Sequence, residues 1–111
     1  MAFGFLMRDS IYILHLVGER DALGSELAIF TRGKRVQCGW GRASFRAEDD
    51  PYGRETRERA IAITPPLSEE PRWVERAGRA FAVKEVRRFS GFGTDHWELL
   101  LEEYNGRFEI R

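Results

Sequence analysis

The sequence predicts a mainly β protein: a small antiparallel β-barrel, or a small sandwich, of about six to seven strands with one long polar loop. Short runs of alternating apolar and polar residues recur along the chain, and turn-forming residues separate them about every eight to twelve positions. No internal repeat or coiled-coil heptad competes with this pattern. The 111 residues, 42% of them apolar, fit one domain with its own core, residues 1–111.

Three runs predict the first strands. Residues 11–17 are apolar and rich in β-formers, which favours a strand buried on both faces. Residues 18–25 contain two glycines and an aspartate, so the chain should turn back there. Residues 26–32 are predicted to form the partner strand, Gly33-Lys34 a second tight turn, and residues 36–42 a further strand.

A long polar segment interrupts the β pattern at residues 43–58. Phe45 and Tyr52 are its only large apolar residues, and most of the others are charged. Connections longer than about 12–15 residues are uncommon in compact domains and are usually functional or disordered. We therefore expect one long loop that projects from the barrel.

The second half of the chain returns to the β pattern. Residues 59–64 alternate isoleucine with alanine, and residues 73–89 are typical of a hairpin with a glycine turn. Residues 96–104 predict a long strand, and the turn signal Asn105-Gly106 leads to a brief edge strand at residues 108–110. The alternation in the long strand places three large apolar side chains on one face: Trp97, Leu99 and Leu101.

Charge and cysteine content narrow the class of partner. Eighteen basic and 18 acidic side chains give a formal net charge of zero, so no overall field would draw the chain onto a polyanion. No run approaches the roughly 20 apolar residues that span a bilayer, and we expect no membrane partner. Cys38 is the only cysteine, which excludes an internal disulfide and favours folding inside the cell.

Residues with catalytic or metal-binding chemistry are sparse, and we expect no enzymatic activity, no cofactor and no metal. His15 and His96 lie far apart in the sequence and do not give the ligand spacing of a zinc site. No pattern supports a dyad of Cys38 with either histidine. The acidic run at residues 48–50 is not followed by a regular oxygen-ligand loop, so a solvated charge run is the simpler interpretation.

The order of these elements resembles the head-completion proteins of tailed bacteriophages, also called head-closure proteins or stoppers, and the related head–tail joining proteins. Residues 11–17 and the turn Asp21-Ala22-Leu23-Gly24 look like that family's first strand and its Asp-x-x-Gly turn. Residues 73–86 look like its terminal hairpin, where a glycine turn precedes an aromatic–x–Val–x–x–Val strand. Residues 97–101 are similar to its last strand, so the likeness extends from residue 11 to about residue 104.

The resemblance implies a structural role in the virion. Members of this family are β-barrels that assemble as a ring beneath the portal and adaptor and keep packaged DNA in the capsid before the tail attaches. The implied location is the neck of the virion, at the head–tail interface, after synthesis in the host bacterial cytoplasm. The implied partners are other copies of the chain in a ring, portal and adaptor proteins, tail proteins, and packaged double-stranded DNA without sequence specificity.

The resemblance also implies a functional loop, because a long loop between internal strands contributes to the channel gate in the best-understood members. Residues 43–58 are the segment that corresponds here, and their mixed charges would allow pairing around a ring. This loop has more arginine and aspartate than the family pattern accounts for, so gating is a hypothesis. Its channel or gating candidates are Arg42, Arg46, Glu48, Asp49, Asp50, Tyr52, Arg54, Glu55 and Arg57.

A ring needs apolar contacts between subunits. We interpret residues 1–10 as an N-terminal docking segment, because a chain end with three apolar side chains must either dock or stay exposed. The candidates for the subunit interface are Phe3, Phe5, Leu6 and, in the glycine-rich turn, Phe92.

Two other functional interpretations stay open. The chain could be a different part of the same connector, a tail terminator or an adaptor with a similar barrel. It could also be a small nucleic-acid-binding β-barrel, since arginines of the long loop alternate with Phe45 and Tyr52 as in surfaces that stack single strands. Interleaved acidic residues bring the local charge of that loop near balance and weaken this second alternative.

Overall fold

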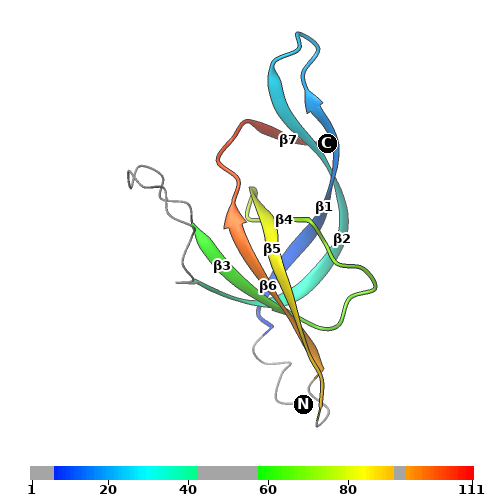
Figure 1. Cartoon of the computed structure of the whole chain (residues 1–111), viewed down its shortest axis with the longest axis vertical. Helices are drawn as coiled ribbons and strands as arrows, with labels where there is room; N and C mark the ends of the chain where they lie inside the picture. Colours follow the sequence, from blue (N-terminus) through cyan, green and yellow to red (C-terminus); the bar gives the residue numbers. More distant parts are fainter. Residues whose placement is uncertain (1–6, 43–57, 92–94) are drawn as a thin grey trace.

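The computed structural model describes residues 7–42, 58–91 and 95–111, and all regular structure in these ranges is β. No helix that could cross a membrane occurs in them. Figure 1 shows the arrangement of the strands. They are β1 (Asp9–Arg20), β2 (Glu26–Arg42), β3 (Arg59–Thr64), β4 (Trp73–Arg76), β5 (Arg79–Phe89), β6 (His96–Glu103) and β7 (Phe108–Ile110).

Six of the strands close into a barrel. Their order is β1-β4-β5-β6-β3-β2, and β2 pairs again with β1. Each of these pairings is antiparallel. The fold class predicted from the alternating runs is therefore confirmed as a closed six-stranded antiparallel barrel with one added strand, β7.

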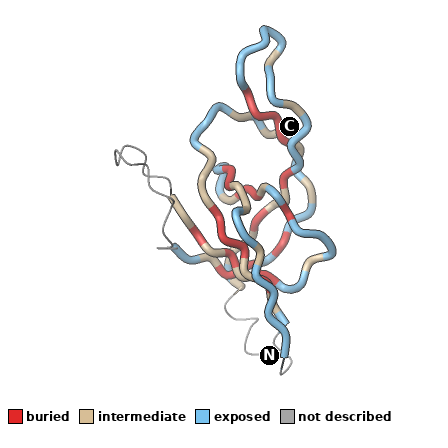
Figure 2. The backbone as a smooth tube through the Cα atoms, in the orientation of Figure 1, coloured by how far each residue is buried: buried red, intermediate tan, exposed pale blue. Residues whose placement is uncertain are grey.

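The barrel interior combines small side chains on one wall with large ones on the others. Ala60 and Ala62 of β3 are fully buried, whereas the isoleucines that alternate with them are half-buried. Phe81 and Leu99 fill the space that these alanines leave, since the interior of a small barrel must be packed by its own side chains. Figure 2 shows buried stretches on the strands of the barrel and a further buried stretch on β2 beside the C-terminus. The predicted inward face of β6 is confirmed: Trp97, Leu99 and Leu101 are all buried.

The tight turn predicted at Gly33-Lys34 is wrong, because β2 runs through both residues without a break. Tyr12 pairs with Arg35 and Leu14 with Arg32, so two residues of β2 lie opposite one residue of β1. This is a β-bulge, which bends a strand without ending it. Glycine is required there, because a Cβ on Gly33 would lie 2.7 Å from His15 Nε2 and 3.0 Å from the Ile13 carbonyl oxygen.

The hairpin of β1 and β2 reaches beyond the barrel (Figure 1). Its connection is shorter than the predicted turn, because β1 continues to Arg20 and β2 begins at Glu26. Asp21 Oδ1 accepts hydrogen bonds from the backbone N–H of Leu23, at 2.9 Å, and of Ser25, at 2.8 Å. Gly24 has a φ of 81°, a conformation that favours glycine. The sequence signals thus specify a well-ordered hairpin tip.

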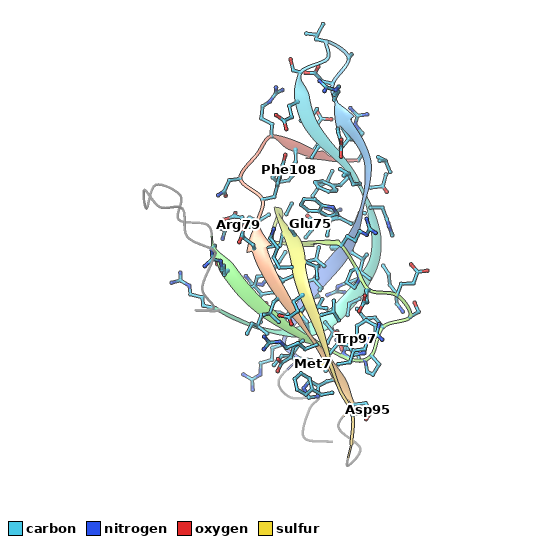
Figure 3. All side chains as sticks on the ribbon, viewed as in Figure 1. Met7, Glu75, Arg79, Asp95, Trp97 and Phe108 are labelled. Carbon is cyan, nitrogen blue, oxygen red and sulfur yellow. The ribbon has the colours of Figure 1, made fainter. Side chains whose placement is uncertain are left out.

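The predicted edge strand at residues 108–110 forms, but it does not lie beside β6. It pairs in parallel with Ala28–Phe30 of β2. The pairing lets Phe108 pack edge-on against Phe30, with ring centroids 6.3 Å apart, in a second apolar cluster that also contains Trp73 and Tyr104. Figure 3 shows Phe108 at this level, above Glu75 and Arg79. Both edges of β6 are already paired, with β3 and with β5, so β7 pairs with a part of β2 that β3 does not cover, where its apolar side chains reach Phe30.

Candidate functional site

Most of the residues predicted to act lie outside the part of the chain that the structure describes. Arg42 is described, and it is exposed at the last position of β2. The remaining channel or gating candidates are outside the described residues: Arg46, Glu48, Asp49, Asp50, Tyr52, Arg54, Glu55 and Arg57. The interface candidates Phe3, Phe5, Leu6 and Phe92 are outside them as well.

The structure does describe the frame that holds residues 43–57. Gly39 pairs with Ile63 and Arg42 with Ala60, so the segment joins two neighbouring antiparallel strands of the barrel. Two residues are enough for such a connection. Residues 43–57 are therefore an insertion in a hairpin, and the rigid β2–β3 ladder fixes the positions of both ends of the insertion.

Arg79 holds the carboxyl end of this insertion. Its Nη2 lies 2.5 Å from Glu58 Oε2 and 2.6 Å from Glu103 Oε1, while its Nε lies 2.6 Å from Glu103 Oε2. The hydrogen bond to Glu103 is the main reason that the pKa of Arg79 is raised above its usual value. The backbone N–H of Glu103 also donates to the Glu58 carbonyl oxygen at 2.8 Å. No local sequence signal points to this network, since its charges meet across strands that are distant in the sequence.

A second exposed region lies at the other end of β2, on the distal half of the β1–β2 hairpin. Leu23 at its tip is 91% exposed, Val17 is 60% exposed and Leu16 is 36% exposed. The prediction that residues 11–17 are buried on both faces is therefore wrong beyond Leu14. Exposed apolar groups gathered on one element are typical of contact surfaces. We term the residues Leu16, Val17 and Leu23 the hairpin surface.

A partly buried ion pair, with Arg32 46% exposed, joins the base of this hairpin to the barrel. Glu75 of β4 is 6% exposed and accepts two hydrogen bonds from Arg32, at 2.8 and 2.9 Å. This contact raises the pKa of Arg32, whose guanidinium also lies 4.7 Å from the centre of the Tyr12 ring. A bidentate pair of this kind fixes direction as well as distance. It therefore sets the angle at which the hairpin leaves the barrel.

Many of the described arginines form ion pairs with acidic side chains, which weakens the case for nucleic-acid binding. An arginine that already pairs with a carboxylate must give up that contact before it can neutralise a phosphate, so its contribution to affinity for a polyanion is small. The described arginines that lie within 4 Å of a carboxylate are Arg32, Arg59, Arg76, Arg79, Arg87, Arg88, Arg107 and Arg111.

The sole thiol is not an activated nucleophile. Cys38 is fully buried, and burial raises its pKa to about 11 from the ordinary value of 9.0. A catalytic cysteine needs the opposite, a thiolate that forms near neutral pH. Within residues 7–42, 58–91 and 95–111, no group of three or more His, Cys, Asp or Glu side chains could hold a metal ion.

A groove of about 1070 Å³ lies between the β1–β2 hairpin and the connection from β3 to β4. Lys34 and Arg35 line one wall, and Glu69 and Glu70 lie in the facing connection. Glu70 pairs with Arg88 at 3.1 Å, so the acidic wall is already partly neutralised. The groove brings no catalytic set of side chains together.

The chain matches no protein-family model, and it matches no curated protein.

Proposed function

We propose that the chain is a ring-forming structural subunit of the neck of a tailed-phage virion. In this role it is a head-closure, or stopper, protein that connects the portal and adaptor to the tail and retains packaged DNA. The observation that carries the proposal is the insertion at residues 43–57 between two neighbouring strands of a closed barrel, at the opposite end of β2 from the hairpin tip (Figure 1). A rigid body that separates two contact regions suits a connector.

The elements that carry the family resemblance all lie in the folded frame. Residues 11–17 belong to β1, residues 73–86 form the β4–β5 hairpin, and residues 97–101 belong to β6. In that hairpin the glycine turn has positive φ at Ala77, 52°, and at Gly78, 79°. Apart from the turn at Asp21–Gly24, which lies at the hairpin tip, the resembling motifs contribute strands to the barrel, which supports the assignment of a shared fold.

The frame explains how a ring could use the insertion. In a symmetric ring every copy would present residues 43–57 at the same height, because the β2–β3 ladder and Arg79 fix where the segment leaves and re-enters the barrel. Without this frame, the position of the insertion would differ between subunits, and the width of a narrow channel would be uneven. The proposed role involves no catalytic activity. The buried thiol of Cys38, whose pKa is raised to about 11, is consistent with this role because it is not an activated nucleophile.

The experiment is electron microscopy of the purified chain mixed with a portal–adaptor complex and, separately, with tail tubes. We expect a ring of the chain on the portal–adaptor complex. Attachment to tail tubes alone would assign the chain as a tail terminator instead. Binding to free DNA that weakens steeply with salt, without attachment to either assembly, would favour the nucleic-acid-binding alternative.

A further inference from the structure

Three strands form a small sheet beyond the barrel, and this sheet has two open edges. Past Leu14, β1 pairs with β2 alone, because its pairing with β4 covers only Tyr12 to Leu14. β7 pairs with the other side of β2. Among the described residues, no strand lies along the outer edge of β7 or along residues 15–20 of β1.

The outer edge of β7 presents free backbone groups. Ala28 N–H donates to the Arg107 carbonyl oxygen at 3.0 Å, and Arg111 N–H donates to the Phe30 carbonyl oxygen at 2.8 Å. Backbone groups of alternate residues in a strand point to opposite sides. The N–H and C=O groups of Phe108 and Ile110 therefore face away from β2.

The outer edge of β1 is only partly protected: Glu19, Arg20 and two register shifts against β2, at Leu16/Gly18 and Gly18/Arg20, are features that blunt an exposed strand. Residues 15–20 contain no proline, and their sequence includes the exposed Leu16 and Val17 of the hairpin surface. Open edges of this kind invite another strand, and proteins that do not use them generally block them.

The two edges are complementary in charge and in apolar surface. Exposed Glu19 and Glu26 lie on the hairpin, and Arg107 and Arg111 flank β7. Within one copy Arg107 lies 3.9 Å from Asp21 and Arg111 2.9 Å from Glu109, so pairing across the contact would exchange these partners. Leu16 lines a hollow of about 390 Å³ together with Trp73 and Tyr104, the residues whose cluster includes Phe108 and Ile110. The apolar sides of both edges thus lie on the same face of the sheet.

We infer that β7 of one copy pairs with residues 15–20 of β1 in the next copy, so that the three-stranded sheets join between subunits. β7 is parallel to β2 and therefore antiparallel to β1, and a rotation about an axis along the strands preserves that relation. The contact is head-to-tail, the type that generates rings when its rotation closes. The role of this contact in a neck ring rests on the proposed function. The contact itself involves only copies of this chain.

Two variants, each with one cysteine added to the native Cys38, test the contact. V17C and E109C are purified separately, mixed at high concentration and oxidised slowly. Within one copy these positions flank β2, about 10 Å apart, which is too far for a disulfide. The native Cys38 is buried and protonated and does not compete. We expect a V17C–E109C heterodimer and, from the double variant V17C/E109C, a ladder of larger species.

The matched control for position is V17C mixed with K84C, which places an exposed cysteine on β5 of the barrel. Heterodimer yields no higher than in this control would overturn the inference. A dominant homodimer of V17C alone would overturn it too, because that product indicates β1 pairing with β1 across a twofold axis.

A second pair of variants tests the backbone. I110P in the E109C protein removes the outward N–H and leaves the backbone hydrogen bonds of Arg107 and Arg111 to β2, so the barrel should keep its unfolding midpoint. Ile110→Ala is the control, since it loses the same side chain but keeps the N–H. We expect the heterodimer to be lost with proline and kept with alanine, and equal yields would contradict the proposed pairing.

The disulfide experiments test the contact between copies separately from the proposed function in the phage neck. A heterodimer from chains that bind neither portal nor tail would leave the contact standing and refute the proposed function. A ring on the portal whose copies do not form this disulfide would refute the contact and leave the proposed function standing.

Discussion

Arg79 of β5 donates two hydrogen bonds of 2.6 Å to the carboxylate of Glu103 on β6, and the same guanidinium forms an ion pair with Glu58. This contact links two walls of the barrel to the residue that follows the insertion. Because the Arg79 side chain is 47% exposed, solvent screens the attraction, and the network acts more by fixing geometry than by adding stability.

Arg79→Ala should lower the free energy of unfolding by roughly 0.5–1 kcal/mol, the range for exposed ion pairs in a good geometry. It should also speed amide hydrogen exchange at Arg59 and Ala60, where β3 begins. Urea denaturation and hydrogen exchange measure the two effects. Arg87→Ala is the control on the same strand, since Arg87 and its partner Glu85 are both about half exposed, and it should change neither quantity. Equal effects from the two substitutions would contradict the anchoring role.

Cys38 should make stability fall at alkaline pH. Its pKa is about 11 in the folded chain and 9.0 ordinarily, so between these values the unfolded thiol ionises while the folded one stays protonated. The stabilisation is complete below about pH 9 and is lost as pH rises towards 11, by roughly 2–3 kcal/mol. The measurement is the urea midpoint from pH 8 to pH 11. Cys38→Ala should show a shallower decline, and parallel curves for the two proteins would exclude this explanation.

Gly33 should tolerate no side chain, in contrast to Gly41. Gly33→Ala places a methyl group against His15 and the Ile13 carbonyl oxygen, and we expect a loss of about 1–3 kcal/mol, as in other overpacked sites. No atom lies within 4 Å of a Cβ built on Gly41, so Gly41→Ala should be close to neutral. His15→Ala in the Gly33→Ala background should recover part of the loss, because it relieves one of the two contacts. Thermal unfolding measures all three variants, and similar midpoints for the two glycine variants would refute the requirement.

Deletion of residues 46–55 should separate folding from retention of DNA. The barrel should keep its unfolding midpoint, because Arg42 and Ala60 are paired neighbours and the remaining residues easily join them. Under the proposed function, heads carrying the deletion should assemble but leak DNA, which a nuclease-protection assay of packaged DNA would detect. Tight, infectious particles would refute the gating hypothesis, and an unfolded barrel would show that the insertion is needed for the fold.

Local pattern was enough to predict most strands, because alternation of apolar and polar residues records directly which face of a strand is buried. β3, the β4–β5 hairpin and the inward face of β6 follow from it. Gly33-Lys34 was misassigned because a glycine beside a lysine gives the same signal for a turn and for a bulge. Which of the two forms depends on the strand opposite, here at His15.

The candidate site was less predictable than the fold. The long insertion is visible in the sequence as a polar run. Most of the gating candidates in it lie outside the part of the chain that the structure describes. The contacts that frame it are long-range: Arg79 meets Glu58 and Glu103 only after three strands have come together. No residue pattern within a single segment predicts this ion-pair network.

By itself the sequence determined most of the strands, the inward face of β6, the ordered tip at Asp21 and the position of the insertion, because these depend on neighbouring residues along the chain. Tertiary structure alone decided that six strands close, that β7 runs parallel to β2, and that the far half of β1 keeps an open edge. The physical reason is that pairing and closure depend on how distant apolar surfaces, such as Phe30 and Phe108, pack together.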